Sequence, residues 1–137
     1  VNSVGEARVA MEVARAVGLP CWVAFVPDYR GKLFTGETFQ QAVGALEPLG
    51  VDAILLNCAP PDDITSGMKE LAPHAKVPIG TYAHVGRFDP PEWMFTNEYP
   101  PGRYRDESAR WKQMGASILG GCCGTTPDHI AQLASLR

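Results

Sequence analysis

Hydrophobic positions along the chain follow two alternating spacings, which predict where strands and helices lie. Four short runs are almost wholly apolar, as expected of strands covered on both faces; they span residues 21–26, 53–57, 77–83 and 117–119. Elsewhere apolar side chains recur at the spacing of an amphipathic helix. This second pattern predicts five helices, at residues 4–17, 38–49, 62–71, 104–114 and from 126 onward.

Polar residues at the predicted helix starts support these boundaries. Thr38, followed three residues on by Gln41, has the spacing of a capping box. Asp62 or Asp63 is placed to cap the third helix, and Thr126 is placed to cap the last one.

The regular alternation of strands and helices predicts an α/β fold with a parallel sheet. Units of about 30 residues with one strand and one helix each are typical of βα repeats. A complete (β/α)8 barrel of the TIM type takes roughly 250 residues, so 137 residues with four strands correspond to half of one. A flavodoxin-like open sheet is the competing architecture, and it also binds ligands at the carboxyl ends of its strands. Length alone does not separate the two.

One segment fits neither spacing. Residues 84–103 are rich in proline and glycine, which argues against a regular element, yet they carry four aromatic side chains: Phe88, Trp93, Phe95 and Tyr99. We expect a long loop that packs over the end of the sheet. The alternative role for these aromatics is a cage that holds a methylated cation by cation–π attraction.

Composition disfavours two classes of partner. The chain has 12 basic and 15 acidic side chains and no run of lysine or arginine, so a nucleic-acid-binding surface is not expected. Every apolar stretch is far shorter than the roughly 20 residues that span a bilayer, so we expect no membrane segment. Val1 follows no basic and apolar leader, and we expect a cytoplasmic protein of which this is a piece.

Three of the four cysteines fall where parallel α/β folds place their chemistry. Cys58 directly follows the second predicted strand, and Cys122 and Cys123 follow the fourth, so all three belong to one edge of the sheet. Three thiolates fill three corners of a tetrahedral Zn²⁺ and leave one position open, as in catalytic zinc sites. A disulfide between Cys122 and Cys123 is the alternative, disfavoured in a reducing compartment. Cys21, at the start of a strand, is expected to be a small buried hydrophobe.

The residues around these thiols resemble a known family. Asn57-Cys58 after an apolar strand, and the run Gly-Gly-Cys-Cys-Gly-Thr-Thr-Pro-Asp-His-Ile at residues 120–130, are similar to the paired zinc-binding motifs of the homocysteine S-methyltransferase family. Residues 82–86 resemble the family's Tyr-x-Asn-x-Gly motif, with His84 in place of Asn, and Glu98-Tyr99 resembles a Glu-Tyr pair in the next loop.

The resemblance implies a fold and an activity. Residues 1–137 would be a partial homocysteine-binding domain, the C-terminal half of a (β/α)8 barrel with strands five to eight and their helices. Zn²⁺ held by Cys58, Cys122 and Cys123 would activate the thiol of homocysteine, which a methyl donor converts to methionine.

Other residues receive roles from their position or from the resemblance. Asn57, Tyr82, His84 and Glu98 are expected to contact substrate. His84 is also an alternative zinc ligand, because imidazole binds zinc well and this residue follows a strand end. His129, in the first turn of a helix, is expected to be solvated or to cap that helix.

Several alternatives stay open at this point. The chain is an enzyme, a zinc-binding fragment without turnover, or a thiol-disulfide regulatory module. S-methylmethionine, S-adenosylmethionine, betaine and a methyl-folate or cobalamin relay are all compatible donors. Because half a barrel has two unpaired strand edges, we expect pairing with the missing half or formation of a homo-oligomer.

Overall fold

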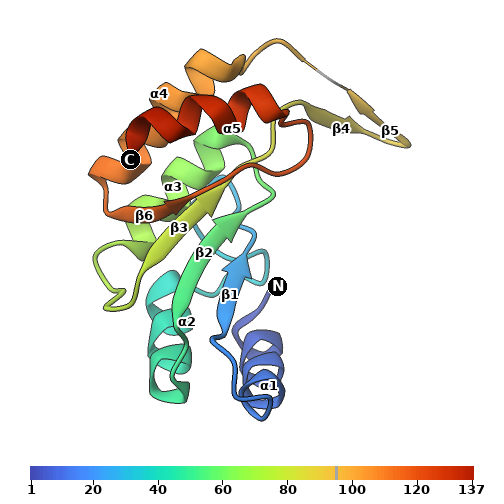
Figure 1. Cartoon of the computed structure of the whole chain (residues 1–137). Coiled ribbons are helices and arrows are strands. Elements are labelled where there is room, and N and C mark those ends of the chain that lie inside the picture. Colours follow the sequence, from blue (N-terminus) through green and yellow to red (C-terminus); the bar gives the residue numbers. More distant parts are fainter. Residues whose placement is uncertain (95) are drawn as a thin grey trace.

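The computed structural model describes residues 1–94 and 96–137. Four parallel strands form one sheet in the order β1-β2-β3-β6 (Figure 1), namely Trp22–Phe25, Ala53–Asn57, Ile79–Tyr82 and Ala116–Leu119. Five α-helices alternate with them, α1 to α5: Val4–Arg15, Phe39–Leu46, Pro61–Leu71, Pro101–Gln113 and Pro127–Leu133. The predicted alternation of four strands with five helices is confirmed. In the part of the chain described, no helix is both long and apolar enough to cross a membrane.

The helix starts follow local chemistry, with two corrections to the predicted boundaries. The capping box of Thr38 and Gln41 is present, with each residue bonding the backbone N–H of the other. The prediction that Asp62 or Asp63 caps α3 is wrong, because Pro60 occupies that position and both carboxylates lie in the first turn. Helix α4 begins at Pro101 rather than at residue 104, since proline is well suited to the first turn of a helix.

The strand order places all the helices on one face of the sheet. Strands that follow one another in the chain also lie side by side, and right-handed crossovers between such neighbours all pass over the same face. Consecutive helices accordingly contact each other along this face. Phe25, Ile54 and Leu56 point into this layer and are fully buried. A flavodoxin-like sheet reverses its strand order and covers both faces, so the sheet is of the barrel type.

The opposite face of the sheet is open. Trp22 lies on it with 59% of its surface exposed, although its neighbour Val23 on the helix side is buried. A hollow of about 350 Å³ lies over this face, between Trp22, Ala24 and Leu55 on one side and Tyr82 and Ile118 on the other. In a closed barrel, side chains of the remaining strands fill the interior that this face borders.

The proline-rich segment after β3 contains a hairpin that the sequence pattern did not predict. Strands β4 (Arg87–Asp89) and β5 (Glu92–Met94) pair antiparallel, with Phe88 opposite Trp93, and project from the end of the sheet (Figure 1). The expectation of a loop without regular elements is therefore wrong for these residues. Strands of three residues are too short to show a period in the sequence.

Candidate metal centre

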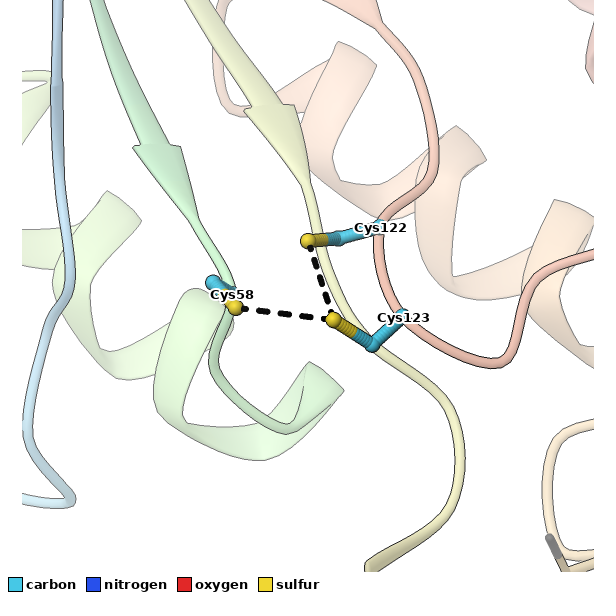
Figure 2. A group of neighbouring side chains, drawn as sticks. All are labelled: Cys58, Cys122 and Cys123. Atoms are coloured by element: carbon cyan, nitrogen blue, oxygen red, sulfur yellow. Dashed lines mark hydrogen bonds between the residues drawn. The ribbon is translucent and has the colours of Figure 1, made fainter. Parts of the chain in front are cut away.

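Three sulfur atoms meet at the carboxyl edge of the sheet. Cys58 follows β2, whereas Cys122 and Cys123 lie in the loop after β6, and all three point to one spot (Figure 2). The Cys123 Sγ lies 4.0 Å from the Cys58 Sγ and 3.7 Å from the Cys122 Sγ. All three ligand atoms lie within 4.8 Å of one another, and they form the only such group of three His, Cys, Asp or Glu side chains in the described residues.

The backbone that continues β3 brings the thiols together. On one side, Cys58 N–H donates to the Tyr82 carbonyl at 3.2 Å and His84 N–H donates to the Ala59 carbonyl at 3.1 Å. On the other side, the Cys122 N–H donates to the Ala83 carbonyl at 2.9 Å. Parallel pairing therefore extends past the strand ends, and it holds both cysteine segments against the same short stretch of chain.

Two backbone conformations at the site depart from ordinary extended chain. Cys58 has φ of 51° and is the only non-glycine residue with positive φ in the described chain. This left-handed conformation costs an L-residue roughly 1–2 kcal/mol. Gly124 has φ of 79°, and a Cβ there would collide with the Val85 carbonyl oxygen. Strain of this kind concentrates at functional sites, where the rest of the fold maintains it.

Burial and neighbouring thiols disfavour ionisation of Cys58 in the absence of a cation. Burial, followed by the neighbouring thiols of Cys122 and Cys123, raises the pKa of Cys58 to about 12. Burial is also the largest cause of the raised pKa of Tyr82, and the thiols of Cys122 and Cys58 add to it. Three thiolates at these distances therefore require a positive charge between them.

The donor set fits a zinc ion. Four ligands placed tetrahedrally at a Zn–S distance of about 2.3 Å are about 3.8 Å apart, close to the sulfur separations in this cluster. All four cysteines are free thiols, so the alternative disulfide between Cys122 and Cys123 is not formed. Cys21 lies apart from the cluster, buried, with its thiol 3.3 Å from the Leu19 carbonyl oxygen, as expected of a structural cysteine.

The predicted substrate residues have different surroundings. Asn57 and Tyr82 are in register on β2 and β3. The Asn57 Oδ1 is buried and has no hydrogen-bond partner, which is costly unless a ligand supplies one. His84 lies outside the sulfur group but beside Cys58; burial is the main cause of its lowered pKa. Glu98 is exposed in the loop before α4.

The three described aromatic residues of the proline-rich segment have different surroundings. Trp93 packs edge-on against His84, with ring centroids 5.0 Å apart. Tyr99 is buried beneath the Arg103 guanidinium, 4.4 Å from the ring centroid, whereas Phe88 is 59% exposed. Phe95 lies outside the described residues. Of the described rings, Tyr99 is therefore packed as expected, whereas Phe88 is not.

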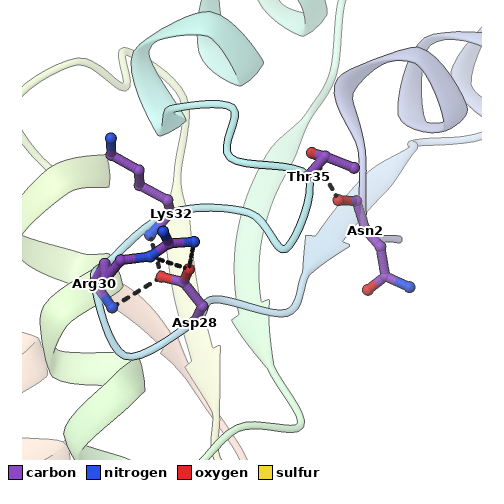
Figure 3. A network of polar contacts seen from close by, with 5 residues as sticks. All are labelled: Asn2, Asp28, Arg30, Lys32 and Thr35. Carbon is purple, nitrogen blue, oxygen red and sulfur yellow. Dashed lines mark hydrogen bonds and ion pairs between the residues drawn. The ribbon is translucent and has the colours of Figure 1, made fainter.

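The loop after β1 reaches the same edge but uses its polar groups internally. The buried Asp28 carboxylate accepts hydrogen bonds from the backbone N–H groups of Arg30 and Lys32 (Figure 3). It also forms an ion pair with the Arg30 guanidinium at 2.6 Å. The Thr35 hydroxyl donates chiefly to the Glu37 carboxylate at 2.6 Å and makes a longer contact of 3.4 Å with the Asn2 carbonyl oxygen, ahead of α1. This network shapes the loop and leaves no carboxylate oxygen directed at the thiols.

The sequence pattern did not indicate the contacts that two residues near the site make. Tyr104 was predicted only as the first residue of a helix, but its hydroxyl reaches the carboxyl ends of two strands. His129 caps α5 as expected, because its Nδ1 accepts from the Thr126 N–H, yet it is buried rather than solvated. The sequence does not reveal these two contacts, because an aromatic residue on an amphipathic helix normally indicates core packing. Only the tertiary structure shows that the Tyr104 hydroxyl reaches two strand ends and that His129 is buried.

Comparison with known proteins gives a consistent picture. A family model described as Homocysteine S-methyltransferase matches residues 1–136. The chain is 34% identical to a methionine synthase of Mycobacterium leprae, in a match that covers 96% of this chain and 11% of that protein. It is 29% identical to homocysteine S-methyltransferase 1 of Arabidopsis thaliana, covering 91% of this chain and 40% of the relative.

Solved structures show the same fold. The metallated form of the homocysteine methyltransferase MmuM from Escherichia coli superposes with a TM-score of 0.79 at 24% identity, and the match covers 100% of this chain and 43% of that one. The chain therefore spans about two fifths, or less, of the length of these relatives.

The left-handed backbone at Cys58 leads to a stability prediction. In the metal-free chain, Cys58→Gly should be more stable than Cys58→Ala by about 1 kcal/mol, because alanine keeps the strain of positive φ. Urea denaturation followed by circular dichroism measures the difference. Cys122, whose φ is not positive, is the matched control, and there the alanine variant should be the more stable. Equal stability of the two Cys58 variants would show that the position is unstrained.

Proposed function

Because the chain belongs to the homocysteine S-methyltransferase family, we propose that it holds Zn²⁺ through Cys58, Cys122 and Cys123 and contributes the metal half of a site that methylates homocysteine. The observation that carries this proposal is the meeting of three free thiols, from two strand ends, within 4.8 Å. Three protein sulfurs leave one tetrahedral position for a substrate atom.

The chemistry follows from the charge of the donor set. When bound, zinc would keep the thiol of homocysteine deprotonated at neutral pH, where a free thiol with a pKa of about 8.5 is mostly protonated. The three cysteine thiolates contribute more negative charge than neutral imidazoles would, so the substrate sulfur stays electron-rich. That sulfur forms a bond to the methyl carbon of the donor, and the donor leaves with the electron pair of the broken bond.

The remaining predicted residues orient the substrate. Asn57 Oδ1, buried and without a partner, is suited to accept a hydrogen bond from the ammonium group of homocysteine. Tyr82 lies beside it in register, and His84, held edge-on by Trp93, borders the same space. Glu98 is the second acceptor in this proposal, from the exposed loop ahead of α4.

The domain assignment is part of the proposal. Residues 1–137 constitute strands five to eight of the barrel with their helices, and the open sheet face pairs with a half of about four further strands. Val1 already bonds to the outer edge of β1 as one rung of a parallel ladder: its N–H donates to the Ala24 carbonyl at 2.8 Å, and its carbonyl accepts from Val26 at 3.4 Å. This edge therefore accepts a parallel strand.

A zinc-binding fragment without turnover is the second candidate. It is favoured by the chain's coverage of only 40% of the Arabidopsis relative and by the open inner face, because a substrate needs walls on both sides. Experiments on metal binding and on substrate binding separate the two candidates.

The first experiment tests the ligands. The purified chain should bind one Zn²⁺, and Cys58→Ser or Cys123→Ser should weaken binding by more than the roughly 10- to 100-fold that follows loss of an outer hydrogen-bond partner. Cys21→Ser is the matched control and should bind like the parent chain, since its thiol lies apart from the cluster. Competition with a chromophoric chelator measures the affinities. Parent-like affinity in Cys58→Ser would remove that residue from the site.

The second experiment tests the open position. In the cobalt-substituted chain, homocysteine should change the thiolate-to-metal absorption, whereas homoserine should not, because only a thiol is soft and acidic enough to join three thiolates. An unchanged spectrum with a fully loaded site would support the zinc-binding fragment without turnover. A response to both compounds would contradict sulfur-specific binding.

The third experiment tests the open sheet face. At micromolar concentration the chain alone should self-associate, because Trp22 and its neighbours expose apolar surface worth about 25 cal/mol per Å² when buried. Trp22→Glu should shift sedimentation equilibrium toward the monomer. Val13→Glu is the matched control, since Val13 is 68% exposed on the outer side of α1. A parent chain that stays monomeric would contradict the unpaired half-barrel.

A further inference from the structure

The loop that carries Cys122 and Cys123 needs a support that the zinc site itself does not provide. Three glycines flank the two cysteines, at positions 120, 121 and 124, and glycine-rich chain loses much conformational freedom when it is held in one shape. Bonds to the continuation of β3 fix this loop from one side. A second contact reaches the loop from the helix layer.

Tyr104 supplies that contact. It lies on α4, fully buried, and its hydroxyl oxygen is 2.8 Å from the Gly120 carbonyl oxygen and 3.1 Å from the Ala83 carbonyl oxygen. A phenol has one proton, so it donates chiefly to the nearer Gly120 carbonyl, and Ala83 shares it. The Ala83 carbonyl also accepts from the N–H of Cys122. One hydroxyl thus joins the ends of β3 and β6 two residues ahead of Cys122.

The Tyr104 ring is itself held in place. It packs edge-on against Trp111, with centroids 5.9 Å apart, and against His129 at 5.6 Å. His129 is fixed in turn, because its two ring nitrogens bond Thr126 and the Tyr99 carbonyl. A buried hydroxyl needs its hydrogen bond, since burial without one costs free energy. The aromatic packing alone would be satisfied by phenylalanine.

We propose that Tyr104 is a positioning residue of the metal centre: its hydroxyl sets the distance between the Cys122–Cys123 loop and the end of β3, and thereby presents both sulfurs to Cys58. The inference rests on the proposed zinc site and assigns a role that the cysteine motifs do not contain. Tyr104 acts through the loop and touches neither metal nor substrate.

The test removes the hydroxyl and keeps the ring. Tyr104→Phe should bind Zn²⁺ roughly 10- to 100-fold more weakly than the parent chain, as expected for loss of a hydrogen bond behind metal ligands. The thiolate-to-cobalt absorption of the cobalt-loaded variant should shift as well, because the sulfur positions change. Both measurements are made on protein that circular dichroism shows to be folded.

A matched control separates positioning from general stability. The Ser3 hydroxyl caps α1 by accepting from the Glu6 N–H at 3.1 Å, beside the opposite edge of the sheet from β6. Ser3→Ala removes this bond away from the cysteine loop and from Tyr104, so it should lower the free energy of unfolding without changing zinc affinity or the cobalt spectrum. Equal loss of affinity in both variants would reduce Tyr104 to a structural role.

The remaining outcomes are decisive. If Tyr104→Phe does not fold, 4-fluorophenylalanine at position 104 fills the space of the hydroxyl without donating, and it should show the same loss of affinity. Parent-like affinity and spectrum in a folded variant without the hydroxyl would overturn the inference and leave the zinc proposal intact. Failure of the parent chain itself to bind zinc would overturn both.

Discussion

The short backbone stretch that continues β3 is the constraint on which the site depends. Along residues 81–85, successive residues bond alternately to the two neighbouring segments: Tyr82 and His84 bond toward Cys58, whereas Ala83 bonds toward Cys122. This alternation is the ordinary period of a strand, carried beyond the last residue of the regular sheet. Two chain segments that are distant in sequence therefore meet at a spacing fixed by strand geometry, and their sulfurs come within reach of one ion.

The same parallel pairing explains why the molecule is open. Sequential strand order places every helix on one face, so the other face has Trp22 and Tyr82 beside solvent rather than beside a second layer. In a barrel, the sheet closes on itself and this face becomes the buried interior. The thiols lie where the rim of such a barrel would be, which accords with the general placement of active sites in (β/α)8 folds.

Local strain and buried hydrogen bonds make the arrangement of sulfurs specific. Cys58 adopts a left-handed conformation that is held by pairing with the continuation of β3, and Gly124 permits a close approach to Val85 that no side chain would allow. The left-handed backbone costs free energy at Cys58, and glycine at position 124 loses more conformational freedom on folding than other residues. Their concentration around three thiols is what a ligand site predicts and a purely structural edge does not.

The sequence alone determined the main strands and helices, the α/β fold class and the three cysteines that form the cluster, because each has a local signal. Apolar runs and helical spacing mark strands and helices over several residues, and the run of residues 120–130 is specific enough to indicate the family. The hairpin around Phe88 and Trp93 has strands too short for such a signal. The choice between barrel and doubly wound sheet was decided only by tertiary structure, since it depends on which strands are neighbours. The same holds for the left-handed Cys58 and the reach of Tyr104 to Gly120, because both arise from contacts between segments that are far apart along the chain.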